Sequence, residues 1–525
     1  MKKKDRRPLL IVAQILLVYL VLLVLLYLSE RGQPGTQIDS LWDAFWYSVV
    51  TLSTVGYGDI TPVSPAGHVI GFIFLILSMG LLIALIGSVV SFMTSEGLPM
   101  LTLRINKDRN WYYLSEFSAE SDTLAKDILK DDPDGLIIFG ESKEEVEERP
   151  DYPCLFITAS PARIVAQKKG QGSRCKMFFL KENDIGKNLK AVDLHELPVD
   201  VYACTMSGQE KMSGNIHFFH TYDCCARSYW REHPLDRDED TIVIIGFGNY
   251  GMALLERAIL TNINDSDFDV SYHVFGDATR FRKIHDCLDL AFGINRRKEG
   301  YDSIYFHEEG WESAHGILSQ ADRIIICDDD EPMGWDCMWQ LQRYYNTKGN
   351  IYLRSNRITP GINYFGTNEQ IFTVNQIVRT RLNDAAVAMN DLYRKSVVDS
   401  LDWDELSDYL KQSKIAAADH LFMKVRVLLK EGPLSALDSR TCRKAYDEFC
   451  RLRNDPEKLD ELRRIEHARW ARFYVYYNWT YGEEYDEALR TSPMIRKYGD
   501  LTEEQRSYHD KAWELLYEIS KQLRR

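Results

Sequence analysis

Two glycines stand at alternate positions in "TVGYGD", residues 54–59, and this spacing can do chemistry with the backbone itself. Because glycine tolerates φ values that other residues avoid, alternate glycines allow successive carbonyl groups to point to one side of the chain. A row of such carbonyls, with the Thr54 hydroxyl beside them, can replace the water around a dehydrated K⁺ ion. The strip that we predict consists of Thr54, Val55, Gly56, Tyr57, Gly58 and Asp59, with K⁺ held at the first four.

A second glycine pattern, "GFGNYG" at residues 246–251, has the spacing of a phosphate-binding turn. It follows the buried-strand pattern "TIVII" (241–245) and precedes an apolar helical pattern, which is the context that the motif requires. Gly246 would allow the tight turn, Gly248 the close approach of a pyrophosphate, and Gly251 the packing of helix on strand. The pattern therefore predicts nucleotide binding; the alternative is a vestigial turn kept for packing.

The acid that follows the next predicted strand, "SYHVFG" at 271–276, would bind the ribose of the nucleotide. This acid is Asp277, and its carboxylate would repel a 2′-phosphate, which favours NAD or an adenine nucleotide over NADP. Arg280 and Arg282 lie nearby in the sequence, and their positive charges would weaken the repulsion of a 2′-phosphate. The predicted nucleotide-binding residues are Gly246, Gly248, Asn249, Gly251, Asp277 and Arg280.

Asp328, Asp329 and Asp330 follow another predicted strand, "RIIIC" at 323–327. Carboxylate oxygens are ligands that Ca²⁺ prefers, so these three acids are a candidate cation site. A solvated loop or a helix cap is the commoner explanation of such a run. The sequence leaves the existence of a Ca²⁺ site open.

Two apolar runs must position the 54–59 strip. Residues 9–28 contain Gln14 as their only strongly polar side chain, and residues 69–93 are equally apolar. Twenty helical residues rise about 30 Å, which is enough to cross the hydrocarbon core of a bilayer. Between the runs, residues 40–53 predict a short helix that enters the membrane and turns back.

The distribution of positive charge predicts the topology. Five Lys and Arg side chains precede the first run, whereas Arg31 is the only one in residues 29–68. The positive-inside rule then predicts a multi-pass protein in contact with the lipid of the cytoplasmic membrane, with cytoplasmic N- and C-termini. A cleaved signal peptide is disfavoured because the run is too long and no small-x-small site follows it.

The motif "TVGYGD" between two spans resembles the selectivity filter of potassium channels. The resemblance implies a homotetramer around a central pore, in which Trp46 and Tyr47 pack against Tyr57. Val50 stands where some family members have a buried glutamate, so inactivation through a carboxyl pair with Asp59 is not expected.

The second apolar run would line the pore on its cytoplasmic side. Gly80 and Gly87 are candidate gate hinges, because glycine weakens a helix locally. Close packing of membrane helices is an equally good explanation of these glycines. No Arg-rich voltage-sensing helix precedes the pore, so we expect gating to come from the cytoplasmic part.

Strands and helices alternate through the next two regions, and paired lobes behind a two-span pore resemble RCK (regulator of K⁺ conductance) domains. The resemblance implies Rossmann-like lobes that assemble into a gating ring. In the first lobe, the strand at 111–117 leads to a helix that begins with Glu120 and Asp122, which would repel a phosphate. The expected fold is therefore multidomain: an all-α two-span tetrameric pore domain (1–95), two α/β lobes (96–236 and 237–395) and a C-terminal α-helical domain (396–525).

The C-terminal stretch "IEHARWARFYVYYNWTYGEEYD", residues 465–486, resembles the ryanodine-receptor repeat (RyR) domain, with Asn478 in place of a common glycine. Its histidine, arginine and aromatic residues could stack on and pair with an anionic nucleotide. An aromatic core in a small helical domain is as good an explanation. The matching motif residues include Glu466, and the candidate ligand-binding residues are His467, Arg469, Trp470, Trp479 and Tyr481.

Composition excludes several other functions. The net charge of −14 disfavours a nucleic-acid partner, and ten cysteines without a CxxC pair predict neither a disulfide framework nor a zinc site. The sequence thus favours a K⁺ channel gated by NAD or an adenine nucleotide, with a second sensor at the C-terminus, and no enzyme. The alternatives are a membrane-tethered NAD-dependent oxidoreductase, which would leave residues 54–59 unexplained, and a C-terminal domain that docks a protein.

Overall fold

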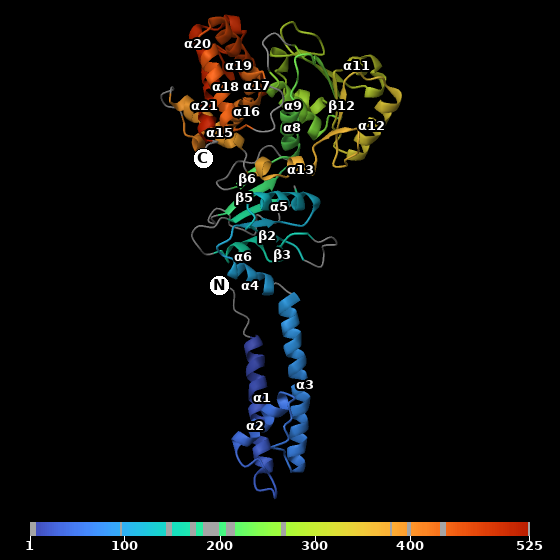
Figure 1. Cartoon of the computed structure of the whole chain (residues 1–525), viewed down its shortest axis with the longest axis vertical. Coiled ribbons are helices and arrows are strands. Elements are labelled where there is room, and N and C mark those ends of the chain that lie inside the picture. The colour runs from blue at the N-terminus through green and yellow to red at the C-terminus, as the bar shows by residue number, and fades with distance from the viewer. Residues whose placement is uncertain are drawn as a thin grey trace. The chain divides into compact units, whose positions relative to one another are not determined.

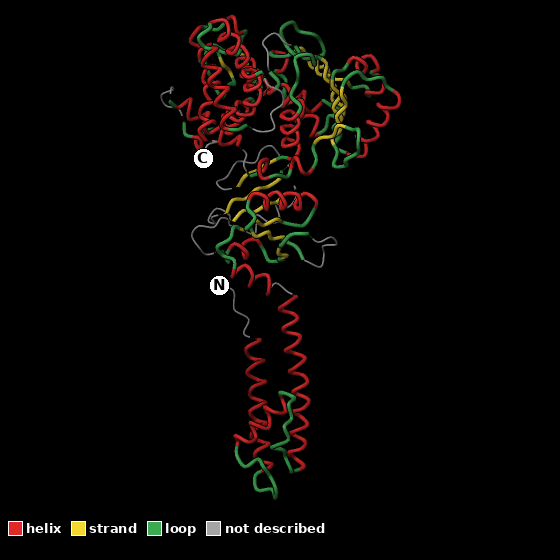
Figure 2. The backbone as a smooth tube through the Cα atoms, viewed as in Figure 1, coloured by secondary structure: helices red, strands yellow, loops and turns green. Residues whose placement is uncertain are grey.

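The computed structural model describes residues 7–94, 97–142, 150–168, 175–181, 199–205, 216–263, 269–378, 381–395, 401–430 and 437–522. The positively charged residues 1–6, on which the predicted topology depends in large part, lie outside the described residues. The chain forms two compact units, Met1–Asn106 and Lys107–Arg525 (Figures 1 and 2).

The first unit is helical. Its helices are α1 (Arg7–Glu30), α2 (Leu41–Leu52), α3 (Pro65–Thr94) and α4 (Gly97–Ile105). The predicted short helix is α2, and Ser40 is its N-cap in a capping box with Asp43, which satisfies backbone amides that the first turn leaves free. Among the described residues, no helix combines the length and the hydropathy that a membrane span requires.

The first lobe of the second unit is built on a six-stranded parallel sheet in the order β3-β2-β1-β4-β5-β6. Its elements are β1 (Trp111–Leu114), α5 (Ala119–Asp131), β2 (Leu136–Phe139), β3 (Cys154–Phe156), α6 (Pro161–Val165), β4 (Cys175–Phe179), β5 (Val199–Cys204), β6 (Ile216–Phe219) and α8 (Thr221–Glu232). Strands β1 and β2 are buried throughout, as expected of a parallel sheet covered on both faces. Glu120 and Asp122 lie in the first turn of α5, as predicted.

The second lobe repeats this topology in a seven-stranded parallel sheet, β13-β12-β11-β7-β8-β10-β9. Its strands are β7 (Thr241–Ile245), β8 (Ser271–Phe275), β9 (Gly293–Ile294), β10 (Ser303–His307), β11 (Arg323–Ile326), β12 (Asn350–Arg354) and β13 (Asn363–Phe365). Its helices are α9 (Asn249–Thr261), α10 (Thr279–Ile284), η3 (Leu288–Leu290), η4 (Trp311–Ser313), α11 (His315–Gln320), α12 (Glu331–Tyr344), α13 (Asn368–Ile371) and α14 (Val374–Ile377). The chain order reverses between β7 and β11, which is where ligands bind in open α/β sheets.

The C-terminal part is mainly helical. Its elements are α15 (Arg381–Arg394), η5 (Trp403–Glu405), α16 (Asp408–Asp419), α17 (Leu421–Leu429), α18 (Ser439–Leu452), α19 (Pro456–Tyr476), β14 (Thr480–Tyr481), β15 (Thr491–Ser492), η6 (Tyr498–Asp500), α20 (Glu503–Ser507) and α21 (Asp510–Gln522). A buried cluster that includes Phe449, Trp513 and Leu516 forms its core.

Helix α9 of the second lobe carries ion pairs and hydrogen bonds to the C-terminal part. Arg257, which is buried, donates to Asp419 of α16 at 2.6 Å and forms an ion pair with Asp223 of α8 at 2.8 Å. The Tyr476 hydroxyl donates to Glu256 at 2.8 Å. The same helix thus begins at the glycine-rich turn and contacts the C-terminal helices through Glu256 and Arg257.

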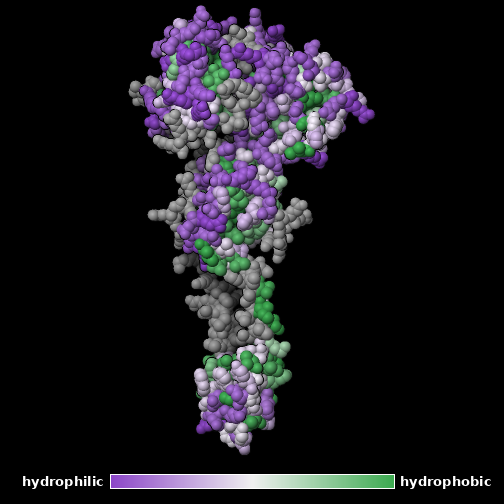
Figure 3. All heavy atoms as spheres, in the orientation of Figure 1, coloured by the Kyte–Doolittle hydropathy of each residue, from purple (hydrophilic) through white to green (hydrophobic). Residues whose placement is uncertain are grey.

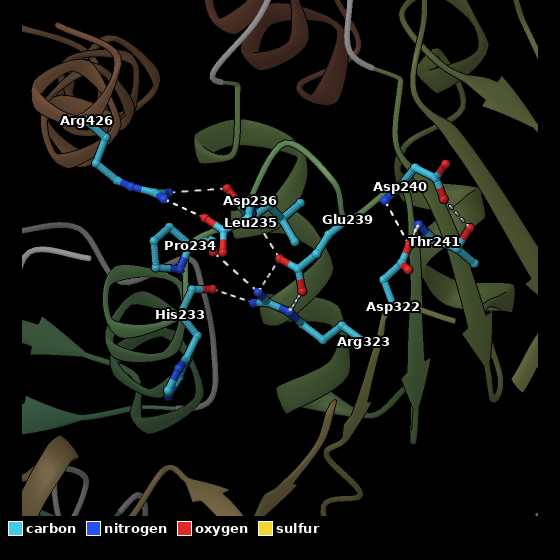
Figure 4. Close-up of polar contacts among 10 residues, drawn as sticks. All are labelled: His233, Pro234, Leu235, Asp236, Glu239, Asp240, Thr241, Asp322, Arg323 and Arg426. Carbon is cyan, nitrogen blue, oxygen red and sulfur yellow. Dashed lines mark hydrogen bonds and ion pairs between the residues drawn. The ribbon is translucent and has the colours of Figure 1, made fainter. Parts of the chain in front are cut away.

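The linker between α8 and β7 is held by two arginines (Figure 4). Arg323 of β11 donates to the Glu239 carboxylate at 2.8 Å and to the His233 carbonyl at 2.5 Å. Arg426 of α17 donates to Asp236 at 2.9 Å. The second lobe and the C-terminal helices therefore both contact the segment that connects the two lobes.

Candidate functional site

The 54–59 strip has left-handed backbone at alternate residues. The φ angles are +60° at Thr54, +58° at Gly56 and +71° at Gly58. The carbonyl of Val50 in the last turn of α2 accepts hydrogen bonds from the amides of Val55 and Gly56, at 3.1 and 3.2 Å. The two glycines thus have the conformation for which the sequence analysis required them, and Thr54 shares it without being glycine.

Trp46 of α2 contacts the strip from one side. Its indole nitrogen donates to the Asp59 carboxylate at 2.9 Å, and its ring lies nearly parallel to that of Tyr57 with centroids 6.5 Å apart. Within the chain, the hydroxyl of Tyr47 lies beside α3: a Cβ on Gly71 would be 2.5 Å from it. The side chains of successive helical residues point in different directions, which explains why Trp46 and Tyr47 have different partners.

Sequence reasoning missed Glu30, the last residue of α1. Its side chain is fully buried and accepts hydrogen bonds from the amides of Val63 and Ser64, both at 2.9 Å, and from the Ser64 hydroxyl at 2.6 Å. A Cβ on Gly67 would lie 1.9 Å from its carboxylate. Glu30 therefore connects the segment that follows the strip to the end of α1. The residues around Glu30 carry no local sequence signal of this role.

The two candidate hinges lie within an unbroken α3. Gly80 and Gly87 are exposed in the chain, and a Cβ on either would meet no atom of the described chain within 4 Å. Crowding within the chain therefore does not require glycine at these positions.

The second lobe has a cleft of about 690 Å³ at the switch point between β7 and β11. Gly246 and Gly248, Asp277 after β8, and Asp328 after β11 all line it. Of the residues that sequence analysis assigned to a nucleotide, Gly246, Gly248 and Asp277 thus lie together at the carboxyl ends of the strands. Asn249, Gly251 and Arg280 are not among the lining residues.

The three glycines of the turn serve different purposes. Gly246 has a φ of +91°, and a Cβ there would lie 2.6 Å from the amide nitrogen of Asp328. A Cβ on Gly251 would lie 2.2 Å from the Gly246 carbonyl, so this glycine lets helix pack on turn, as predicted. At Gly248 the close neighbour is the Asp329 carboxylate, which a Cβ would approach to 2.5 Å.

Asp277 and Arg282 line the cleft, whereas Arg280 does not. Asp277 is exposed, and hydrogen bonds from Thr279 lower its pKa, so its carboxylate stays ionised. Arg282 lines the cleft, whereas Arg280 is exposed and is not among the lining residues. The basic residue nearest to a ligand in the cleft is therefore Arg282 and not Arg280.

The three acids after β11 do not act together. Asp328 accepts a hydrogen bond from the amide of Asp330, whereas Asp329 accepts from the amide of Asn249 at the start of α9. Within the described ranges, no group of three or more His, Cys, Asp or Glu side chains is arranged to hold a metal ion.

The C-terminal motif lies largely in a buried network. Glu466 forms ion pairs with Arg469 at 2.7 Å and Lys424 at 2.9 Å, and all three side chains are at most 3% exposed. His467 is 5% exposed, and its ring nitrogens contact the Arg496 carbonyl at 2.9 Å and His509 at 3.2 Å. These contacts make His467 part of the core and not a free ligand-binding group.

The His467–His509 pair should make the C-terminal part sensitive to acid. Burial lowers the pKa of His467 to about 4 and that of His509 to about 3, from 6.5. A folded-state pKa below the unfolded value gives stability that is present above pH 6.5 and is lost as the pH falls toward the folded pKa. We expect the free energy of unfolding to fall by about 1.4 kcal/mol per pH unit for each histidine between about pH 6 and pH 4.

Thermal unfolding of the full chain between about pH 7 and pH 5 measures this loss. The His509→Gln variant, which cannot take up a proton, should show a shallower pH dependence. If the stability of that variant depends on pH as steeply as that of the unmodified chain, the loss of stability does not come from His509.

The remaining motif residues differ in exposure. Trp470 and Trp479 are buried, and Trp479 lies parallel to Tyr409 with ring centroids 5.3 Å apart, whereas Tyr481 is 51% exposed. Among the described residues, the indole nitrogen of Trp479 and one terminal nitrogen of Arg469 find no hydrogen-bond partner.

Asn478, which follows α19, lies in a left-handed turn. It has a φ of +62°, and its side chain donates to the Ile284 carbonyl at 2.6 Å. Asparagine tolerates this conformation better than most residues, so the turn does not require glycine.

The N-terminal part of the chain is similar to known proteins. Residues 14–95 match a family model described as "Ion channel". The chain is 44% identical over 64 residues to a "Voltage-gated potassium channel" of Aeropyrum pernix, covering 12% of this chain and 22% of that protein. It is 38% identical over 109 residues to "Two-pore potassium channel 4" of Arabidopsis thaliana, covering 20% and 38%. The chain thus spans well under half the length of either relative.

Among solved structures, the chain is similar to that described as "Crystal structure of the GsuK bound to ADP". The alignment has a TM-score of 0.36 and 15% sequence identity, and it covers 70% of this chain and 97% of that one.

Proposed function

We propose that this protein is a ligand-gated, potassium-selective channel of the cytoplasmic membrane. The observation that carries the proposal is the alternating left-handed backbone at Thr54, Gly56 and Gly58 within a segment that matches ion channels. Such a backbone lets carbonyl groups face one side, where they replace the hydration shell of K⁺. The ligands of the ion are the carbonyls of the strip and the Thr54 hydroxyl.

Exposed apolar side chains support a membrane pore made of several chains. Val69, Phe72, Ile76 and Ile83 of α3 are each more than half exposed, and Figure 3 shows hydrophobic side chains at the surface of the first unit. Large exposed apolar surfaces mark contacts with lipid or with other chains. A homotetramer in lipid covers them, with the apolar runs of residues 9–28 and 69–93 as the two spans that the sequence predicts and Gly80 and Gly87 as hinges of the inner helix.

The ligand that gates this pore is NAD or an adenine nucleotide, bound in the cleft of the second lobe (237–395). The glycine-rich turn and Asp277 lie in its wall, where a nucleotide's phosphates and ribose bind in doubly wound folds. The first lobe (96–236) carries acids in the corresponding first turn of α5 and takes no phosphate there. Both lobes belong to the gating ring behind the pore domain (1–95).

The C-terminal domain (396–525) is a second sensor, for a nucleotide-type signal, and α9 couples it to the cleft. The ligand-facing residues of this domain are Arg469, Trp479 and Tyr481. Coupling needs a physical link between sites, and α9 supplies one because it starts at the turn and contacts α16 and α19 through Arg257 and Glu256.

Potassium flux into liposomes that contain the purified full chain tests the function. We expect K⁺ flux with exclusion of Na⁺, and a change of flux when NAD, ADP or a cyclic dinucleotide is added. Flux that does not distinguish K⁺ from Na⁺ would contradict the channel assignment, and flux indifferent to every nucleotide would contradict the gating assignment.

Tyr476→Phe tests the coupling through α9. The change removes the hydroxyl that donates to Glu256 and leaves the ring in place, so we expect basal K⁺ flux to persist while the response to a C-terminal ligand falls several-fold. Tyr344→Phe removes an exposed hydroxyl outside the C-terminal domain and is the matched control for coupling. An undiminished response in Tyr476→Phe would show that the contact transmits nothing.

A further inference from the structure

Asp329 lies at the position of the α9 N-terminus that a phosphate of a bound nucleotide would take. Its carboxylate accepts hydrogen bonds from the amides of Asn249 at 3.0 Å and Tyr250 at 3.2 Å. A helix N-terminus attracts anions through its free amides and its dipole, and a carboxylate satisfies both. The close approach that Gly248 permits is therefore used by a side chain of the same protein.

The backbone that carries Asp329 is held in place from the next strand. Arg354, at the end of β12, donates to the Asp328 carbonyl at 2.7 Å and to the Asp329 carbonyl at 3.1 Å. Its guanidinium also lies 4.1 Å from the ring centroid of Tyr250. Asp329 itself is exposed, so its side chain can turn toward solvent while the backbone stays where Arg354 holds it.

The charged residues that line the cleft do not neutralise a second anion placed beside the Asp329 carboxylate. The charged lining residues are Asp277, Arg282, Glu308, Glu309, Glu312, Asp328 and Asp336, of which only Arg282 is basic. Two anions cannot share the same two amides, and the surrounding carboxylates repel a phosphate further. A nucleotide's phosphate group therefore has to displace the Asp329 carboxylate.

We propose that Asp329 is a built-in competitor for the phosphate groups of the nucleotide, which occupies their position until a ligand displaces it. The inference rests on the nucleotide site proposed above and describes its regulation. The competitor weakens the binding of phosphate-bearing ligands and does not affect a nucleoside, whose ribose binds at Asp277. It sets a high ligand threshold for the cleft, because only a nucleotide at sufficient concentration releases the carboxylate.

Binding of ADP and of adenosine to the full-length chain, measured by calorimetry, tests the competitor. Asp329→Ala removes the carboxylate, so we expect ADP to bind on the order of tenfold tighter than to the unmodified chain, with adenosine unchanged. Asp330→Ala removes the same charge one residue away, where the side chain does not contact α9, and should stay within about twofold. Asp329→Asn keeps an acceptor for the amides without the charge, and its gain should be intermediate.

The outcomes separate this inference from the nucleotide site itself. If the unmodified chain binds ADP and Asp329→Ala binds it no tighter, the competitor is overturned and the nucleotide site stands. Equal gains for ADP and adenosine would also overturn it, because they indicate general loosening of the cleft. If neither ligand binds any variant, the nucleotide site and the competitor both fail.

Discussion

Alanine at Gly56 or Gly58 is expected to abolish the preference for K⁺ over Na⁺. Both residues have φ angles in the left-handed region, where a side chain costs about 1–2 kcal/mol per residue. A Cβ would meet no described atom of the chain within 4 Å, so the penalty is one of backbone strain and not of crowding. Relief of the strain turns the carbonyls away from the ion, and a penalty of about 1.4 kcal/mol in one chain reduces the conducting population about tenfold.

Gly35→Ala is the matched control for these two substitutions. Gly35 has a φ of +84° and no described atom within 4 Å of an added Cβ, but it lies outside the strip. The same backbone penalty there should leave K⁺ flux in liposomes selective. Selective flux in Gly56→Ala and Gly58→Ala would contradict the pore assignment. Loss of selectivity in Gly35→Ala would show that backbone strain anywhere in this unit is enough to abolish selectivity.

Glu466→Gln is expected to destabilise the C-terminal domain by about 3–5 kcal/mol, which is typical when one partner of a buried ion pair is removed. The Glu466 carboxylate is the partner of both Lys424 and Arg469, and all three are buried. Without its negative charge, two cations remain in a medium of low polarity with no compensation. Burial already lowers the pKa of Lys424 to about 8, so loss of its proton at higher pH should reduce the penalty.

Denaturant unfolding of the full chain, followed by tryptophan fluorescence, measures this change. Glu461→Gln on the same helix is the control, because its pair with Lys458 is exposed and should contribute at most about 1 kcal/mol. A loss below about 1 kcal/mol in Glu466→Gln would contradict a structural role for the network.

Most of the fold was predictable because its signals are local. The runs at 241–245, 271–276 and 323–327 became β7, β8 and β11, since continuous apolar stretches between turns indicate buried parallel strands. The short helix predicted over residues 40–53 became α2. The left-handed backbone of Gly56 and Gly58 followed from the residue type alone.

The functional sites were predictable only in part. The sequence placed Gly246, Gly248 and Asp277 in one cleft, because the motif and the strand order imply it. It selected Arg280 where Arg282 lines the cleft, since the direction of a side chain on a short helix depends on where that helix begins. It also grouped His467 with the ligand-binding residues, because a motif does not reveal that a histidine contacts a second buried histidine far along the chain.

Sequence by itself determined the short-range features of this protein: the glycine-rich strip, the glycine-rich turn, the apolar runs and the order of strands and helices. Only the tertiary structure decided which distant groups neutralise one another. Glu30 binds the amides of residues 63 and 64, Arg257 binds Asp419, and Asp329 occupies the start of α9. Backbone propensity acts over a few neighbouring residues, whereas the partner of a buried or capping charge depends on how the chain crosses from one strand to the next.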